Sequence, residues 1–400
     1  MKKVLLLILI VILSIIFYND YRIKHAIIKV ETINDLNIEV YSKIRLSDLL
    51  KDINGKLITN KTINTTKLGK KEIKFNYINN DNIKVSYSFY INVVDTTPPI
   101  ISEVNVINTY EGSSLDIKER LFYADNYDKN PICDIEGEYN LNKVGSYNIL
   151  FKCTDKFNNI SKEELTINVL KKNDIKKEPT ITYYEDIYSK FKNEKTKIGI
   201  DISYYQGNIN YDKLKNKIDF VFLRVGYGKN RNNKYILDSK FKEYITNFNK
   251  LNIPVGIYFF SYDENNKDAK ESAKWVLKQI KKYKVTLPIV YDWENFTNFN
   301  DYHLSLYNLN DMANTFIETI KKQEYKAMIY SSKNYLKYAW DNNYNVWIAH
   351  YNENENYENK YKFWQICDDG KIDGINGNID IDIMYKWFTH TKYYDKLLKE

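Results

Sequence analysis

A short run near the C-terminal third, Leu287-Pro288-Ile289-Val290-Tyr291-Asp292-Trp293-Glu294, decides the expected fold. Its apolar, β-rich residues predict a buried strand, and Pro288 is tolerated because it stands where the strand begins. Side chains alternate along a strand, so Asp292 and Glu294 are expected on one face, ~6–7 Å apart by strand rise. Two acids beside an aromatic ring suit glycoside hydrolysis, in which one carboxyl donates a proton and a neighbouring charge stabilises an oxocarbenium-like centre. A strand that simply ends in solvated acids is the competing interpretation.

Other short apolar runs on both sides of this segment indicate further strands. They cover residues 197–203, 220–225, 254–260, 327–330, 346–350, 363–366 and 377–382. Apolar residues that recur every three to four positions predict helices at 239–251, 266–282 and 309–323. This alternation predicts a mostly parallel sheet, closed or nearly closed, over about 200 residues, and hence an α/β fold of the irregular TIM-like (β/α) barrel type.

Polar side chains stand at or near the ends of several of these strands. They are Asp201, Asp292, Glu294, His350 and Asp380. In parallel barrels the groups at the C-terminal ends of the strands line the active site, so we expect these side chains to converge there.

Residues 197–390 resemble family 25 glycoside hydrolases, the Chalaropsis-type lysozymes. The matching features are spread in order along the segment: Gly199-Ile200-Asp201-Ile202-Ser203 with Gln206-Gly207, Phe220–Val225 with Gly228, Pro254–Phe260, Asp292-Trp293-Glu294, Trp347–Tyr351, Trp364-Gln365 and Ile379-Asp380. The resemblance covers roughly half the chain and implies an irregular β/α barrel. It also implies cleavage of the β-1,4 bond between N-acetylmuramic acid and N-acetylglucosamine in peptidoglycan.

By the same resemblance, Glu294 is the general acid and Asp292 assists at the substrate's 2-acetamido group or the developing positive charge. Asp201 and Asp380 are the other two acids of the family's site. The candidates for the sugar cleft are Tyr258, His350, Tyr351, Trp364 and Gln365. Aromatic faces stack on sugar rings, but aromatic side chains are more often simply core. Spacing leaves retaining and inverting chemistry open, and the resemblance implies net retention.

Two other functions remain open on these residues. One is a wall-binding surface protein whose barrel grips glycan without cutting it, and the other is a glycosidase of different specificity, such as a chitinase. Retention of all four acids favours an enzyme, because a binder needs the cleft but not the acid pair. Histidines and cysteines with metal-ligand spacing are lacking, as is a glycine-rich phosphate loop, so neither a metal nor a cofactor is expected.

The N-terminus predicts export. Lys2 and Lys3 precede an apolar run at 4–17 that is broken only by Ser14. Its length fits a signal-peptide core and is short for a membrane span, yet no small-residue cleavage motif follows. Residues 1–25 are therefore expected to be an uncleaved signal anchor or a signal peptide. The protein is expected outside the cytoplasm, facing the wall from the membrane or secreted.

Residues 26–170 favour β-sandwich modules over helices, because short alternating runs rich in Ile, Val, Tyr and Thr dominate. An internal repeat with an offset of 76 residues relates Leu68-Gly69 to Val144-Gly145 and Ile91-Asn92-Val93 to Ile167-Asn168-Val169. Two copies of one module explain that offset. The second, at 96–170, resembles bacterial immunoglobulin-like surface domains, whereas the first, at 26–95, is more divergent. A spacer role is expected for both.

Composition agrees with an exported wall enzyme. The net charge of +7 favours contact with anionic wall polymers. The 59 basic residues are interspersed with 52 acidic ones, so the sequence shows no continuous basic stretch of the kind that binds nucleic acid. Residues 171–196 are expected to be a charged linker and 391–400 a C-terminal tail. Cys133 and Cys153 could form a bridge or remain free thiols, and Cys367 has no evident partner. We expect a monomer.

Overall fold

The computed structural model describes residues 2–172, 181–228, 234–352, 357 and 359–385. The chain forms two compact units, which span residues 1–97 and 98–400. The expected C-terminal tail, residues 391–400, lies outside the described residues.

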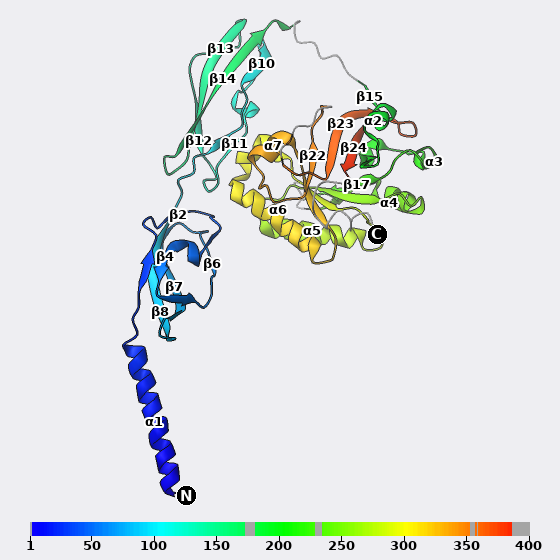
Figure 1. The fold of residues 1–400 in the computed structure, drawn as a ribbon. Coiled ribbons are helices and arrows are strands. Elements are labelled where there is room, and N and C mark those ends of the chain that lie inside the picture. Colours follow the sequence, from blue (N-terminus) through cyan, green and yellow to red (C-terminus); the bar gives the residue numbers. More distant parts are fainter. Residues whose placement is uncertain (1, 173–180, 229–233, 353–356, 358, 386–400) are drawn as a thin grey trace. The chain divides into compact units, whose positions relative to one another are not determined.

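The first unit begins with helix α1, Lys2–Lys24 (Figure 1). The described apolar side chains of this helix are exposed. Among the described residues, no helix combines the length and apolar character that crossing a membrane requires. The expectation of a signal anchor or signal peptide at residues 1–25 stays a prediction.

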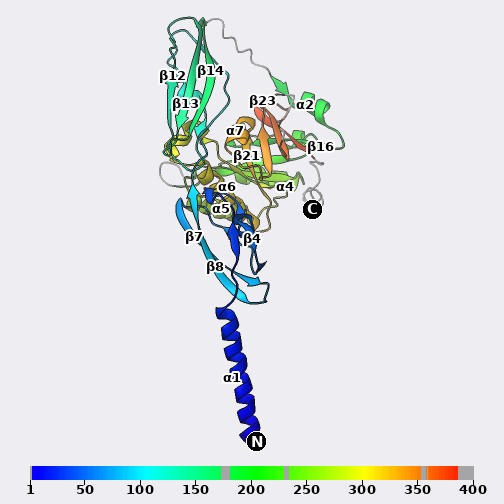
Figure 2. The ribbon, with the colours of Figure 1, turned by 60° about the vertical axis from the view of Figure 1, so that its left-hand side comes forward.

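The rest of the first unit is a β-module, here called the first module. Its long hairpin consists of β7 and β8 (Figure 2). This hairpin lies at the centre of a four-stranded sheet in the order β2-β8-β7-β5. Two small sheets, β1-β4 and β3-β6, complete it. The bounds are β1 Val30–Thr32, β2 Asn37–Glu39, β3 Ile44–Arg45, β4 Leu50–Ile53, β5 Gly55–Leu57, β6 Thr62–Ile63, β7 Gly69–Asn79 and β8 Lys84–Val94.

The second unit begins with a similar β-module at residues 98–170, here called the second module. Its sheets have the orders β10-β14-β13-β12 and β11-β9. The bounds are β9 Ile100–Ile101, β10 Val106–Tyr110, β11 Tyr123–Ala124, β12 Ile132–Glu136, β13 Gly145–Thr154 and β14 Ile160–Leu170.

The two modules share strand positions as well as sequence. Strands β7 and β13 start 76 residues apart, as do β8 and β14. In each module a short strand, β2 or β10, also pairs in parallel with the second strand of the long hairpin. The immunoglobulin-like class of the modules stays a prediction.

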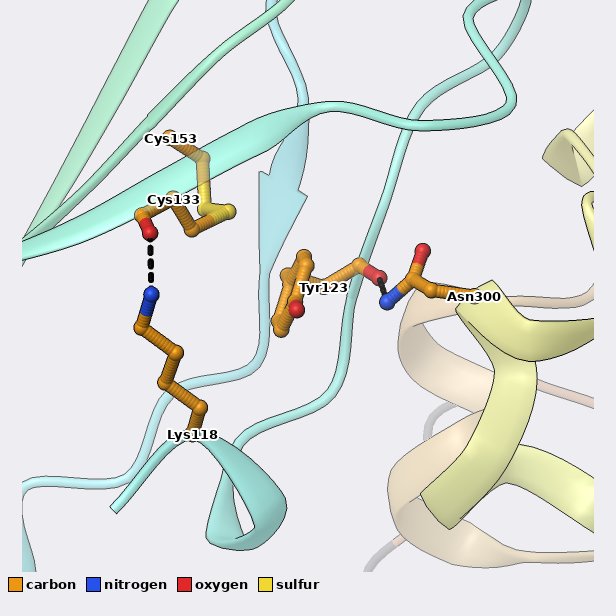
Figure 3. The surroundings of a disulfide bond; sticks show 5 residues. All are labelled: Lys118, Tyr123, Cys133, Cys153 and Asn300. Carbon is orange, nitrogen blue, oxygen red and sulfur yellow. Dashed lines mark hydrogen bonds between the residues drawn. A yellow bond between two sulfur atoms is a disulfide. The ribbon is translucent and has the colours of Figure 1, made fainter. Parts of the chain in front are cut away.

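Cys133 and Cys153 form a disulfide, which decides between the two states left open by the sequence (Figure 3). They are direct partners across strands β12 and β13, so the bridge crosses one antiparallel pair. The Lys118 ammonium donates a hydrogen bond to the Cys133 carbonyl at 2.6 Å. Cys367 is a buried free thiol.

A closed barrel of eight strands forms the core of residues 197–385. Six successive pairings, from β16 through β17, β19, β20, β21 and β22 to β23, are parallel. Strand β24 closes the barrel and is antiparallel to both β23 and β16. The bounds are β16 Thr196–Ile202, β17 Val221–Tyr227, β19 Val255–Phe260, β20 Ile289–Asp292, β21 Ala327–Ser332, β22 Val346–Ala349, β23 Phe363–Lys371 and β24 Ile379–Tyr385.

All eight predicted strands and the three predicted helices are confirmed. The helices are α4 Phe241–Lys250, α5 Asn266–Ile280 and α6 Leu306–Lys321, and they lie outside the strands (Figure 1). Shorter elements are η4 Tyr204–Gln206, α3 Tyr211–Leu214, β18 Ile236–Leu237, η5 Asn295–Tyr302 and α7 Lys333–Tyr338. The barrel interior is filled by aromatic and aliphatic side chains, among them Phe222, Val290, Met328 and Trp347.

Part of the expected linker is folded onto the barrel, which corrects the sequence-based boundary. Strand β15, Thr182–Tyr183, pairs in parallel with β23, and helix α2, Tyr184–Phe191, follows it. The Tyr184 hydroxyl donates hydrogen bonds to the Ile198 and Lys217 carbonyls at 3.0 Å each. This helix has a short buried face, formed by Tyr184 and Ile187. The charged residues around these two positions made the segment resemble a linker in the sequence.

The disulfide yields a stability prediction. Replacing Cys133 and Cys153 with alanine is expected to lower the free energy of unfolding by ~3 kcal/mol. The reason is that the two cysteines are 20 residues apart, so the bridge closes a loop of that length in the unfolded chain. Denaturant titration measures the change, and Cys367→Ala is the control for thiol loss. Equal stability of the double variant and the parent would contradict a formed bridge.

Candidate active site

A cavity of about 200 Å³ lies at the end of the barrel where the parallel strands finish. The four acids predicted as catalytic all line it. The lining residues are Asp201, Ser203, Tyr205, Gln206, Arg224, Tyr258, Phe260, Asp292, Glu294, Tyr330, Trp347, Gln365 and Asp380. A larger hollow of about 790 Å³ near Lys213 and Asn376 contains none of these carboxylates.

Strand register brings the acids together. Asp201 on β16 and Asp380 on β24 are direct partners across an antiparallel pair. Asp292, the last residue of β20, is the partner of Phe260 on β19 and of Tyr330 on β21. Neighbouring strands are ~4.8 Å apart, so side chains at one level of a small barrel converge.

Asp292 and Glu294 form a proton-holding pair. Burial, and then the charge of Glu294, raises the pKa of Asp292 well above its usual range. The Glu294 side chain reaches solvent, yet partial desolvation by the cleft walls also raises its pKa, while its contact with Asp292 opposes that rise. A desolvated pair of like charges keeps a proton to higher pH than an isolated carboxyl does.

Trp293 separates the two acids and points the other way. It is fully buried in the outer core, and its Nε1 donates a hydrogen bond to the Asp263 carbonyl at 3.1 Å. The Tyr291 hydroxyl, on the same face, bonds Asp263 Oδ2 at 3.2 Å. Strand alternation therefore anchors β20 on its outer face while Asp292 faces the cleft.

Gln365 connects two sides of the cleft. Its amide nitrogen donates to Asp201 Oδ2 at 2.8 Å. Its amide oxygen accepts from the hydroxyls of Tyr330 and Tyr351 at 2.8 and 2.9 Å. Burial raises the pKa of Asp201 to about 6, against the lowering effect of the Gln365 hydrogen bond.

Asp380 and Asp382 add two more acids on strand β24. Burial, and then the charge of Asp201, raises the pKa of Asp380 to about 10. Asp382 is fully buried, and burial raises its pKa well above the usual range although Trp347 Nε1 donates to its Oδ1 at 2.8 Å. Sequence analysis omitted Asp382 from the site, but its spacing of two residues from Asp380 carried the signal.

Arg224 is a second residue that sequence analysis missed. It lines the cleft, and its Nε donates to Asp238 Oδ2 at 3.0 Å. Its Nη2 is buried and has no hydrogen-bond partner among the described residues. The guanidinium opposes the rise in the pKa of Asp292. The signal was a lone cation inside an otherwise apolar strand.

Only some of the predicted sugar-binding residues line the cleft. Tyr258 and Gln365 line the cleft. Tyr351 is half exposed and reaches Gln365 through its hydroxyl, while His350 meets Gln365 through the backbone, its N–H donating to the Gln365 carbonyl.

The prediction that Trp364 lines the sugar cleft is corrected, because its side chain is buried in the outer core. It packs edge-on against Phe191 of α2 at 5.5 Å, and its Nε1 donates to the His350 carbonyl. Alternation along β23 sends Gln365 into the cleft and its neighbour Trp364 outward.

Two buried acids lie close together outside the cleft. In the second module, the buried carboxylates of Asp125 and Asp155 have oxygens within 4.8 Å of each other. The two residues are 30 positions apart in the sequence, so no local motif marks them. Asp155 already accepts hydrogen bonds from Phe157 and Asn159.

Residues 200–375 match the sequence model of glycosyl hydrolases family 25. The uncharacterized protein YegX of Escherichia coli O6:H1 is 24% identical over 192 residues, which cover 46% of this chain and 68% of YegX.

Solved structures that this chain matches include the modular autolysin LytC from Streptococcus pneumoniae, with 25% identity and a TM-score of 0.44 over 59% of this chain and 56% of LytC. The catalytic domain of the endolysin Ply40 from a Listeria monocytogenes bacteriophage is 22% identical, with a TM-score of 0.42 over 52% of this chain and 98% of that domain. This chain thus matches little more than half the length of LytC.

A pair of carboxyls in a cleft is the arrangement that glycoside hydrolases use. The family match makes the assignment specific: residues 200–375 belong to glycosyl hydrolases family 25.

Asp382→Asn is expected to stabilise the protein in a pH-dependent way. The raised pKa means that folding takes up a proton, so wild-type stability falls as pH rises above the usual Asp pKa, by up to about 1.4 kcal/mol per pH unit. Asparagine can still accept from Trp347 Nε1 and removes the titration.

Thermal melts should therefore show a variant melting temperature that exceeds wild type by at least ~3 °C at pH 8 and by little at pH 4. A variant that is less stable at pH 8 would show that Asp382 is charged and paired in the folded state.

Proposed function

We propose that the protein is a cell-wall muramidase that hydrolyses the β-1,4 bond between N-acetylmuramic acid and N-acetylglucosamine in peptidoglycan. The observation that carries this proposal is the Asp292–Glu294 pair, whose two carboxyls line a cleft at the carboxyl ends of the barrel strands and whose pKa values are both raised by burial. Membership of residues 200–375 in family 25 supports the reaction class.

In this proposal Glu294 is the general acid. Its side chain reaches the cleft, and its raised pKa keeps a proton available for the departing glycosidic oxygen to higher pH than an ordinary glutamate would. Asp292, deeper and more strongly desolvated, orients the 2-acetamido group or stabilises the positive charge that develops at the anomeric carbon.

Asp201 and Asp380 are the other two acids that line the cleft. Gln365 orients Asp201 by a hydrogen bond, and Asp380 stands directly opposite Asp201 on β24. Asp201, whose pKa is raised only to about 6, can stabilise a sugar ring that bears partial positive charge in the transition state. Asp380, whose pKa is raised to about 10, keeps its proton and can donate a hydrogen bond instead.

Sugar recognition is assigned to the cleft walls. Tyr258 offers a ring for stacking, and Gln365 offers an amide for hydroxyl or acetamido groups. Arg224 Nη2 is a donor placed beside the acids, and it suits a carboxylate or carbonyl of the wall polymer. Tyr351 and His350 support Gln365 from the neighbouring segment.

Glu294→Gln is expected to fold normally and to lose at least ~100-fold in wall lysis, since it keeps the side chain's shape but cannot donate the proton. Asp292→Asn should also be severely impaired. Turbidity loss of purified walls gives the rate, and mass spectrometry of the products identifies the new reducing end.

Three outcomes would contradict the proposal, each differently. Near-wild-type lysis by Glu294→Gln would remove Glu294 from its role. A reducing end on N-acetylglucosamine would change the bond cleaved. Binding of glycan without any new reducing end from the wild type would make the protein a binder.

For location, we propose that residues 1–25 export the chain and hold it to the membrane, so that the barrel faces the wall. A positively charged start and the apolar run of α1 support this. The full-length protein is then expected to stay with membranes after a high-salt wash, which removes electrostatically bound proteins. Recovery of all the protein from the medium, trimmed within α1, would identify a secreted lysozyme instead.

A further inference from the structure

The second module and the barrel share a hydrophobic core through the small sheet β9-β11. Along β11 and its preceding residue, Phe122 and Ala124 belong to the barrel's outer core, whereas Tyr123 packs on Phe151 inside the module. On β9, Ile100 faces the barrel and Ile101 faces the module. Because side chains alternate on a strand, this two-stranded sheet presents one face to each core.

Phe122 packs into an aromatic cluster. Two members of this cluster, Phe296 and Phe299, lie shortly after the proposed acids in the sequence. Phe122 is 5% exposed and contacts the rings of Phe296 and Phe299 edge-on, with centroids at 5.7 and 5.4 Å. It also meets Tyr335 of α7 at 5.4 Å. Phe296 stacks on Tyr335 at 3.9 Å, so the ring of the second module completes a cluster between η5 and α7.

The same cluster holds Trp293. The indole ring packs on Phe296 at 5.1 Å and on Phe299 at 5.9 Å. Since Trp293 stands between Asp292 and Glu294, its position sets the backbone from which both carboxyls project. Two successive ring contacts therefore connect Phe122 to Trp293, the residue between the two acids.

Polar contacts fasten the same segment. The Asn300 side-chain amide donates to the Tyr123 carbonyl at 3.3 Å (Figure 3). The Leu306 N–H, at the start of α6, donates to the Asp125 carbonyl at 2.8 Å. His303 Nδ1 and Asn130 Oδ1 are 2.6 Å apart. Residues 295–306, which follow Glu294, are thus held along their length by the second module.

We propose that the second module is a positioning element for catalysis, in which Phe122 fixes η5 and, through Trp293, the geometry of Asp292 and Glu294. The proposal rests on the proposed function of that pair. Positioning of this kind matters because a displacement of ~1 Å at a reacting group can cost ~100-fold in rate. Phe122 itself touches no substrate, so it is a positioning residue and acts through its neighbours.

The test uses the full chain with three substitutions. Phe122→Ala removes the ring, Phe122→Leu keeps apolar volume, and Phe89→Ala removes a phenyl ring from the first module's own core, where it packs on Phe75. Each variant is compared with wild type for kcat and KM on soluble glycan fragments, for the pH–rate profile, and for backbone hydrogen exchange in residues 293–303.

Phe122→Ala is expected to lower kcat by ~10–100-fold with KM little changed, because the sugar-lining Tyr258 and Gln365 stay in place. Loosening admits water to the acid pair, so the alkaline limb of the profile should move to lower pH. Exchange in residues 293–303 should quicken by ~10-fold or more. Phe122→Leu should recover most of the lost kcat, and Phe89→Ala should match wild type in all three.

A folded Phe122→Ala with wild-type kcat, pH profile and exchange would overturn the proposal. So would an equal loss of kcat in Phe89→Ala, because that would reflect general destabilisation. If wild type releases no reducing ends, the proposed function fails, and the exchange measurement still reports whether Phe122 orders residues 293–303.

Discussion

The closure of the barrel by β24 is the constraint on which the site depends. This strand runs antiparallel between β23 and β16, and it is the only way the described sheet joins its two ends. Closure places Asp380 opposite Asp201 and Asp382 opposite Gln365. If the sheet were open at this point, the acids of β24 would be exposed to solvent. Their pKa values would then fall towards those of ordinary carboxyls.

Burying several acids at one barrel end opposes folding, since each desolvated carboxyl must keep a proton or find a partner. The aromatic packing below the cleft offsets this. Trp347 stacks on Phe222 at 4.6 Å and also donates its N–H to Asp382, so one side chain both fills the barrel and supports an acid. Enzymes commonly retain such destabilising groups where chemistry needs them.

Local patterns in the sequence predicted the strands and the four acids, because hydrophobic period and strand ends are local properties. Register was not predictable, and it decides that Trp364 is core while Gln365 lines the cleft. Arg224 stands out as a single cation among apolar residues, but it was missed because that feature alone matches no functional motif. The role of Phe122 depends on contacts between residues more than 170 positions apart, which no window of sequence contains.

The proposed mechanism requires that the cleft keeps a proton on the Asp292–Glu294 pair to higher pH than ordinary carboxyls hold one. Carboxyl carbon NMR of labelled protein tests it directly, with the Glu294 resonance assigned by its loss in Glu294→Gln. Glu294 is expected to titrate above the usual glutamate range. Titration of Glu294 at or below that range would contradict its role as the proton donor.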